Sequence, residues 1–265
     1  MSFPNSQSLP DEFVEALASA SHRLGLFGGE ILWYPSVSST NDVAGVLAER
    51  GAPEGCVVVA NAQSAGRGRL GRTWASPPGA GLYVSAVLRP KPDVSLLTIA
   101  AGVAVAEGIQ AATGLAVDLK WPNDAFVEGR KVAGILAEAN SSAAGPFVIV
   151  GFGINIMPAA YPPDVAVRAT SIEGELGRAV DRGLLLAECL ASLSSRYADL
   201  QGGRVADVTD AWRLRAAATF GRRVRGDVGG LVLDGVAENL DETGALVVRT
   251  AAGLARVTAG EVTWL

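Results

Sequence analysis

Apolar residues recur at helical spacing in several stretches of the chain and at strand spacing in the segments between them. The helical pattern predicts helices over residues 11–24, 39–50, 94–113, 181–201 and 205–218. Asp11, Ser39 and Asp181 stand at three of the predicted starts, where a side-chain oxygen can accept a hydrogen bond from the first turn. Ser39 and Asp42 also have the spacing of a capping box.

Short apolar runs predict strands over residues 31–37, 56–63, 81–90, 116–124 and 146–156. Residues 125–139 have the pattern of a hairpin that turns at Glu128 and Gly129. After Gly221 the pattern changes to short strands separated by turns, including a hairpin turn at the DETG sequence of residues 241–244. We therefore expect two domains, a larger one of residues 1–219 and a small β-barrel of residues 220–265.

Composition limits the classes of function. A chain of 265 residues with 49% hydrophobic and 18% charged residues is typical of a folded globular protein. The net charge of −5 disfavours broad binding to nucleic acid or to an anionic membrane. Cys56 and Cys189 lie far apart, which favours two core residues in a reducing compartment. We find no leader sequence and no apolar run long enough to cross a bilayer, so we expect a cytoplasmic protein.

The basic residues are distributed unevenly between lysine and arginine. His22 is the single histidine, which argues against a histidine-based catalytic triad and a histidine-rich metal site. Among 22 basic residues the lysines are Lys91, Lys120 and Lys131, and the last two lie in apolar surroundings. A compact ammonium group can perform a task that the planar guanidinium cannot, so Lys120 and Lys131 are candidate functional residues.

The stretch SAGRGRLGRTW, residues 64–74, contains the spacing G-x-G-x-x-G of a dinucleotide-binding turn. That motif requires a strand directly before it, a helix directly after it and an acidic residue about 20 positions later. Here SPPG follows instead of a helix, and no Asp or Glu occurs between Glu54 and Asp93. The alternatives that remain are a flexible loop whose arginines bind phosphate or carboxylate and a solvated loop with no ligand.

Two further stretches favour the ligand-binding alternative. LKWPND, residues 119–124, places Lys120 and Asp124 on either side of a turn, and GRKVAGILAE, residues 129–138, begins with Lys131. The predicted hairpin brings Lys120 and Lys131 near one another beside Asp124. Cations gathered beside a carboxylate and a mobile arginine loop suit a nucleotide phosphate with Mg²⁺.

Five motifs in order resemble the biotin–protein ligases, also called biotin holocarboxylase synthetases. They are SSTND, QSAGRGRLGRTWASPPGAGLYVSAVLRP, LKWPND, GRKVAGILAE and GFGINI, and they span residues 38–155. The resemblance implies an α+β fold, with a catalytic domain like that of class II synthetases, a mixed central sheet and flanking helices. It also implies that the small β domain is SH3-like.

The resemblance implies that the protein activates biotin with MgATP to biotinyl-5′-AMP. The biotinyl group is then transferred to the acceptor lysine of a biotin carboxyl carrier domain of a carboxylase. We expect a monomer or weak homodimer that binds neither nucleic acid nor membrane. Fewer than 40 residues precede Ser39, too few for a helix-turn-helix domain, so we expect the monofunctional type without repressor function.

The resemblance also implies roles for individual residues. Lys131 matches the lysine that reaches the biotin carboxylate and the α-phosphate, and Arg67 and Arg69 match catalytic arginines of the loop over the adenylate. Asp124 matches a position near the metal, and Asn155 matches one near the ribose and adenine. The remaining residues implied to bind biotin or ATP are Ser39, Thr40, Asn41, Gln63, Gly66, Gly68, Arg72, Trp74, Lys120, Trp121, Asn123 and Gly134.

The chain departs from the family at its end, because VTWL stands where some members have an arginine that helps to hold ATP. Two other functions remain open on the sequence alone. A lipoate–protein ligase would share the fold and the chemistry, and a non-enzymatic module could bind phosphate or RNA through the arginine loop. The acidic net charge disfavours the second of these.

Overall fold

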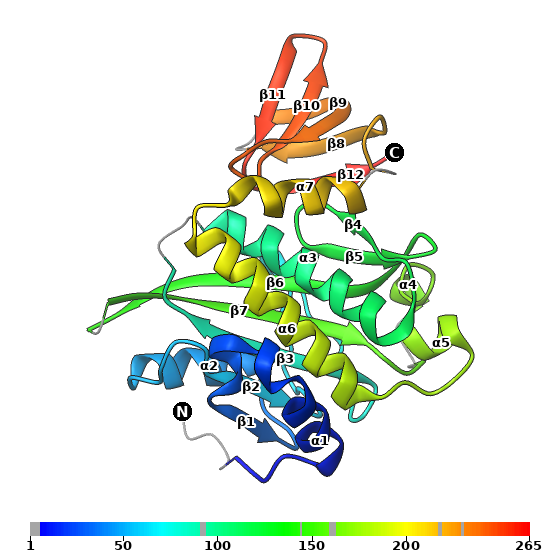
Figure 1. Cartoon of the computed structure of the whole chain (residues 1–265). Coiled ribbons are helices and arrows are strands. Elements are labelled where there is room, and N and C mark those ends of the chain that lie inside the picture. The colour runs from blue at the N-terminus through cyan, green and yellow to red at the C-terminus, as the bar shows by residue number, and fades with distance from the viewer. Residues whose placement is uncertain (1–5, 91–93, 144, 159–162, 217–218, 229–230) are drawn as a thin grey trace.

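The computed structural model describes residues 6–90, 94–143, 145–158, 163–216, 219–228 and 231–265. Within these residues the chain forms a larger sheet covered by helices and a smaller sheet that stands at one end, next to helix α7 (Figure 1). This arrangement confirms the α+β class expected from the sequence.

The larger sheet has the strand order β1-β2-β3-β7-β6-β5-β4. Strands β1 and β2 pair in parallel, and the remaining pairs are antiparallel, so the sheet is mixed. The long strands β6 and β7 form the floor of the site discussed below. The strands are β1 (Ile31–Tyr34), β2 (Val57–Ala60), β3 (Gly81–Leu88), β4 (Asp118–Lys120), β5 (Asp124–Val127), β6 (Arg130–Ser142) and β7 (Gly145–Asn155).

Helices cover both faces of this sheet because its central strands are apolar on both sides. Along β2, Val57 and Val59 join the core beneath helices α1 (Asp11–Ala20), α3 (Val94–Thr113) and α6 (Arg182–Gln201). Val58 and Ala60 point the other way and pack with helix α2 (Thr40–Glu49). Successive side chains of a strand point to opposite faces, so one strand contributes to both cores.

The face that packs on α2 is left open beyond the start of that helix. Along β7, Phe147 and Ile149 belong to the α2 core, and the next residues on the same face are Gly151, Gly153 and Asn155. Small and polar residues thus replace apolar ones where the sheet runs past the helix. The resulting space holds the candidate site.

Helix α3 corrects one expectation from the sequence. We found no apolar run long enough to cross a bilayer, yet Val94–Thr113 has the required length, with a mean hydropathy of 1.6. Two-thirds of the 18-residue stretch that has this hydropathy is buried inside the protein, where α3 packs between α6 and the sheet. The length and apolarity of α3 are therefore those of a core helix that is covered on nearly all sides.

The smaller sheet is antiparallel, with the order β11-β10-β9-β8-β12. Its strands are β8 (Arg223–Val228), β9 (Leu231–Leu240), β10 (Leu246–Thr250), β11 (Gly253–Val257) and β12 (Glu261–Trp264). Helix α7 (Val205–Arg215) lies between the two sheets, and its buried Trp212 packs edge-on against Phe220. Apolar residues of both sheets join in one continuous core on the face covered by α3 and α6, separate from the α2 core.

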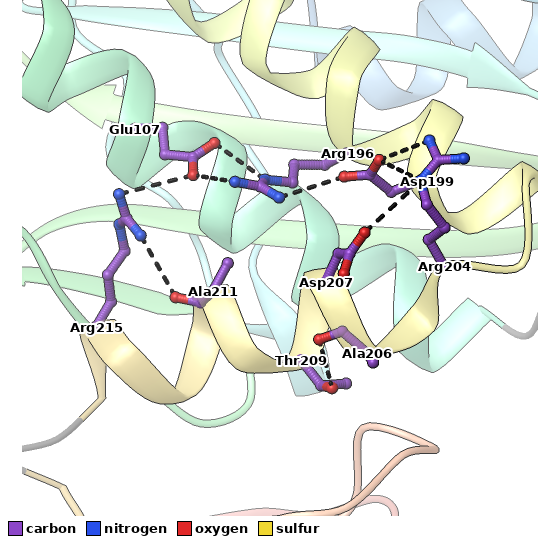
Figure 2. Close-up of polar contacts among 9 residues, drawn as sticks. All are labelled: Glu107, Arg196, Asp199, Arg204, Ala206, Asp207, Thr209, Ala211 and Arg215. Carbon is purple, nitrogen blue, oxygen red and sulfur yellow. Dashed lines mark hydrogen bonds and ion pairs between the residues drawn. The ribbon is translucent and has the colours of Figure 1, made fainter.

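Figure 2 shows how charged residues join α7 to the helices of the larger sheet. Arg196 on α6 donates to Glu107 on α3 at 3.1 Å from Nε and contacts Asp199 at 3.2 Å. Arg204 binds the other side of Asp199 at 2.8 Å, and Arg215 of α7 lies 3.6 Å from Glu107. The guanidinium groups alternate with carboxylates, so each charge faces an opposite one.

Element boundaries differ from the sequence prediction at a few places. The first helix ends at Ala20 and continues as two 3₁₀ turns, Ser21–Arg23 and Gly25–Gly28. Helix α7 ends at Arg215, and residues 217–218 of its predicted end lie outside the described residues. The short helices α4 (Pro163–Ala166) and α5 (Ile172–Leu176) were not predicted. The predicted hairpin turn is confirmed, with positive φ at Glu128 and Gly129.

Candidate active site

A cavity of about 720 Å³ opens on the α2 face of the larger sheet, at the place where β6 and β7 run past the helix. Every site residue expected from the sequence lines this cavity except Gly66. The residues so placed are Ser39, Thr40, Asn41, Gln63, Arg67, Gly68, Arg69, Arg72, Trp74, Lys120, Trp121, Asn123, Asp124, Lys131, Gly134 and Asn155. Residues separated by more than 100 positions therefore meet around one space.

Residues 64–74, which we call the Gly-Arg loop, form a small hairpin over the cavity. The Gly68 N–H donates to the Arg72 carbonyl at 2.7 Å, and the Trp74 N–H donates to the Gly66 carbonyl at 2.9 Å. Gly66 lies at the base of this hairpin, where a Cβ would come 2.4 Å from the Trp74 carbonyl oxygen. A residue without a side chain is needed at this position for the two sides of the hairpin to approach. Gly66 therefore serves the closure of the loop and does not line the cavity. Leu70, at the tip, has a φ of 56° and a side chain that is 70% exposed.

The Trp74 indole lies directly on the sheet. A Cβ at Gly153 would come 2.4 Å from Trp74 Nε1, and a Cβ at Gly134 would come 3.0 Å from Trp74 Cζ3. Gly134 and Gly153 are partners in the register of β6 and β7, so together they make a flat platform for the ring. The Trp74 Nε1 atom is buried there without a hydrogen-bond partner in the described part of the chain.

Lys131, the second residue of β6, enters the cavity from the start of that strand. Its Nζ lies 2.6 Å from Asp124 Oδ1 and 5.2 Å from the centre of the Trp74 ring. Its backbone is held by the segment before α5, since its N–H donates to the Arg168 carbonyl at 2.8 Å and its carbonyl accepts from the Thr170 N–H at 2.9 Å. The ammonium group therefore faces the same space as the arginine loop.

A group of buried polar residues forms the end of the cavity next to α2. The predicted capping box is not formed, because Ser39 caps no backbone N–H with its side chain. Instead, Gln63 Oε1 accepts from the Thr40 N–H at 2.8 Å and lies 3.2 Å from Thr40 Oγ1. Gln63 Nε2 donates to Ser76 Oγ at 2.8 Å, which ties the helix start to the base of the loop. A loop side chain thus caps the helix.

The two arginines of the loop that we expected to be catalytic have different partners. Arg67 Nη2 lies 2.5 Å from Glu138 Oε2 and 3.2 Å from Asp42 Oδ1, toward α2. Arg69 Nη1 donates to Asn123 Oδ1 at 3.3 Å, and its Nη2 donates to the Gly260 carbonyl at 3.1 Å. The loop is therefore held at one side by the larger sheet and at the other by the smaller one.

The opposite end of the cavity borders the smaller sheet. Lys120 Nζ lies 5.5 Å from the Phe126 ring and 5.6 Å from the Trp264 ring. The Trp121 indole is 4% exposed, and its Nε1 donates to the Gly244 carbonyl at 3.0 Å, so Trp121 chiefly joins the two sheets. Asn155 Nδ2 donates to the Thr170 carbonyl at 3.0 Å.

Sequence reasoning missed several residues of the site. Glu138, Asp42 and Ser85 contact predicted site residues, but the residue type of a lone carboxylate or serine in a strand or helix does not mark it as functional. Val165, Val167, Arg168 and Ala169 line the cavity from an unpredicted segment. Strand periodicity could have found Glu138, because alternate residues of a strand share a face and Glu138 therefore lies on the same face of β6 as Gly134 and Leu136.

The donor set suits a magnesium ion that is held largely by phosphate. No group of three His, Cys, Asp or Glu side chains able to hold a metal occurs among the described residues. Asp124, with Asn123 beside it, offers oxygen ligands in the cavity. Mg²⁺ commonly takes one or two protein carboxylates, several waters and the substrate's phosphates, so one carboxylate is sufficient.

Comparisons with known proteins agree with this geometry. Residues 33–155 match the Biotin/lipoate A/B protein ligase family, and residues 219–263 match the Biotin protein ligase C terminal domain. The biotin--[acetyl-CoA-carboxylase] ligase of Paracoccus denitrificans is 38% identical over 77% of this chain and 88% of its own length. The bifunctional ligase/repressor BirA of Bacillus subtilis is 33% identical over 93% of this chain and 78% of its own length.

A solved structure shares the fold of most of the chain. The biotin protein ligase of Aquifex aeolicus, in complex with biotin and ATP, superposes with a TM-score of 0.79 at 29% identity, covering 89% of this chain and 99% of its own. The chain belongs to the biotin protein ligase family.

Proposed function

We propose that this ligase joins biotin to AMP in the cavity described above and then transfers the biotinyl group to the lysine of a biotin carboxyl carrier domain. The observation that carries the proposal is the convergence of Lys131, Arg67, Arg69 and Arg72 on one cavity. We expect biotin at the α2 end, where the amide groups of Asn41 and Gln63 suit a ureido ring. The nucleotide then occupies the end nearer Asn123, Asp124 and Lys120.

In the first step a biotin carboxylate oxygen attacks the α-phosphorus of ATP, and pyrophosphate leaves. The carboxylate is already a nucleophile, so no general base is required. Lys131 stabilises the charge that develops on the phosphoryl oxygens and brings two anions together, with Arg67 and Arg69 adding positive charge from the loop. Asp124 orients the Lys131 ammonium at 2.6 Å, and bound Mg²⁺ would neutralise further phosphate charge.

In the second step the amine of the acceptor lysine attacks the carbonyl carbon of biotinyl-5′-AMP. AMP leaves, the amine loses a proton, and an amide bond forms. We expect the Gly-Arg loop to keep water from the mixed anhydride until the carrier domain arrives. Lys120, held beside Trp264, is a cation able to replace the carboxy-terminal arginine found in some members.

We further propose that residues 1–219 act as the catalytic domain and residues 220–265 as an SH3-like partner that borders the nucleotide end. The acceptor is a carboxyl carrier domain of a biotin-dependent carboxylase, in line with the names of the relatives. A cytoplasmic location and a monomer or weak homodimer remain our expectations.

The direct test is biotin- and ATP-dependent release of pyrophosphate, followed by transfer of labelled biotin to a carrier domain. Lys131→Ala should reduce the rate of adenylate formation by about 100- to 1000-fold, because one preorganised cation is lost. The variant should keep its fold, since Lys131 is partly exposed and its backbone hydrogen bonds remain. Near-normal formation of biotinyl-5′-AMP by this variant would contradict the mechanism.

A lipoate ligase remains the second candidate, because the family model over residues 33–155 covers both activities. The polar α2 end favours biotin, since the dithiolane ring of lipoate offers no hydrogen-bonding groups to Asn41 and Gln63. Parallel assays with both acids discriminate the two functions. We expect pyrophosphate release with biotin to exceed that with lipoate at equal concentration.

A further inference from the structure

Glu138 holds together two parts of the site that sequence reasoning treated separately. One oxygen of this carboxylate, Oε2, accepts from Asn41 Nδ2 at 2.6 Å and lies 2.5 Å from Arg67 Nη2. Asn41 belongs to the buried polar end of the cavity, and Arg67 belongs to the loop above it. A single side chain therefore contacts both.

The contact with Glu138 determines how the Asn41 amide is oriented. Asn41 is 6% exposed, and its Oδ1 accepts from Ser85 Oγ at 2.6 Å. The Asn41 NH₂ group thus faces the Glu138 carboxylate, and its oxygen faces the Ser85 hydroxyl. In the reversed orientation the amide oxygen would face the carboxylate, and two acceptors would meet. Gly151 leaves the space for this arrangement, because a Cβ there would lie 2.0 Å from Asn41 Oδ1.

The contact with Glu138 also fixes the loop. Arg67 is bound by two carboxylates, Glu138 and Asp42, on the side of the loop that faces α2. The other end of the loop is tied to the same polar group, since Thr40 and Ser76 both bind Gln63. Ser85 Oγ closes the connection, 2.7 Å from Thr40 Oγ1. A continuous series of hydrogen bonds thus runs from Arg67 through the cavity wall to the base of the loop.

We propose that Glu138 is a positioning residue that couples the biotin end of the cavity to the Gly-Arg loop. It sets the orientation of Asn41 through hydrogen-bond acceptance, and it holds Arg67 through charge. This proposal rests on the proposed function for the identity of the ligand at Asn41, but the tie to the loop does not depend on that identity.

Three variants separate the two roles. Glu138→Ala removes both, whereas Glu138→Gln keeps an oxygen that can accept from Asn41 and removes the charge that holds Arg67. Asp42→Asn is the control for the contact with Arg67. Asp42 binds Arg67, whereas the Asn41 side chain is hydrogen-bonded to Glu138 and Ser85. Circular dichroism and the unfolding temperature of each variant confirm that it is folded.

Two measurements report the two roles. The KM for biotin reports the orientation of Asn41, because that contact is made equally in ground and transition states, whereas kcat also depends on Arg67, which Glu138 holds. Tryptic cleavage after Arg67, Arg69 and Arg72, identified by mass spectrometry, reports how firmly the loop is held. Cleavage needs no substrate, so it tests the loop tie even if the protein fails to use biotin.

We expect Glu138→Ala to raise the KM for biotin by about tenfold and to speed loop cleavage, because a charge-assisted hydrogen bond is lost on each side. Glu138→Gln should restore the KM to within about threefold of wild type while cleavage stays fast. Asp42→Asn should change the KM less than Glu138→Ala does and speed cleavage less, because Asp42 contacts Arg67 and makes no contact with Asn41 in the hydrogen bonds given above. Wild-type cleavage in Glu138→Gln, or a wild-type KM in Glu138→Ala, overturns the proposal.

Discussion

Of the glycines that line the cavity, Gly151 is the one whose added Cβ would come nearest another atom, at 2.0 Å from Asn41 Oδ1. Strand β7 passes so close to Asn41 that Gly151→Ala forces the Asn41 amide to move. We expect this variant to lose about 1–3 kcal/mol of unfolding free energy, the usual cost of overpacking, and to bind biotin more weakly. Urea denaturation and the KM for biotin measure the two effects.

Gly45→Ala provides the control for that change. Gly45 lies within helix α2, and a Cβ there would meet no atom within 4 Å. Alanine favours the helix over glycine, so the unfolding free energy should rise by about 0.5–1 kcal/mol. If both variants are equally stable, the close approach at Gly151 does not constrain the site.

Asp241 makes stability depend on pH at the turn between β9 and β10. Burial raises the pKa of Asp241, but hydrogen bonds from Thr243, Arg256 and the Ala245 N–H outweigh it, and the pKa is lowered to about 2. A depressed pKa stabilises the fold above the unfolded-state value of about 3.9, and the effect is lost as pH falls toward 2.

Asp241→Asn should therefore lower the unfolding free energy at pH 7 by about 1–2 kcal/mol, since the amide cannot replace the charge. Denaturant unfolding of both proteins, repeated from pH 7 downward, measures the difference. We expect the two curves to converge as the pH falls from about 4 toward 2. A constant difference across this range would mean that the charge of Asp241 contributes nothing.

At the scale of elements, the ionic cluster of Figure 2 holds α3, α6 and α7 in place. Arg196 is its centre and is 21% exposed, so Arg196→Met leaves the half-buried Glu107 and Asp199 with fewer partners. We expect a loss of about 2 kcal/mol in unfolding free energy, less than for a fully buried pair, because Arg204 and Arg215 remain. Thermal or urea unfolding measures it.

The rim of the same cluster gives the matched control. Arg204 and Asp207 are 3.7 Å apart and more than half exposed, so solvent screens their attraction. Asp207→Asn should change the unfolding free energy by less than about 0.5 kcal/mol. An equal effect of both substitutions would show that burial does not determine what each pair contributes.

The elements themselves were largely predictable because each follows from local periodicity. The strand around Gly151 shows two alternating sets of residues, and both sets are buried as the pattern indicates. The hairpin turn at Glu128 and Gly129 follows from its position between two strand patterns and from Gly129, which readily adopts the positive φ that the turn requires. Helix α3 was predicted with its correct bounds, and only its suitability to span a membrane was misjudged.

Contacts between distant residues were not predictable in the same way. Ser39 has the sequence of a helix cap, yet Gln63, 23 positions from Thr40, takes that role. Glu138 lies 97 positions from Asn41, and no local pattern links the two. Tertiary hydrogen bonds override local preference at these positions, and they are the ones that shape the site.

At the scale of the whole molecule, the two sheets share one apolar core, and three contacts join them beside the cavity. These are the hydrogen bond from Trp121 to Gly244, the one from Arg69 to Gly260, and the Lys120 ammonium over Trp264. Each involves a residue that lines the cavity. Occupancy of the cavity should therefore stabilise both sheets together.

Unfolding with and without ligand tests this coupling. At a biotin concentration 100 times the Kd, binding to the native state alone raises the unfolding free energy by about 2.7 kcal/mol. Because both sheets contribute to one core, we expect the protein to unfold in a single transition that biotin shifts as a whole. Tryptophan fluorescence and circular dichroism should therefore give the same unfolding curve. The tryptophans report on both sheets, since Trp74 lies on the larger and Trp264 in the smaller. Two separate transitions, of which biotin shifts the first alone, would show that the smaller sheet folds independently of the site.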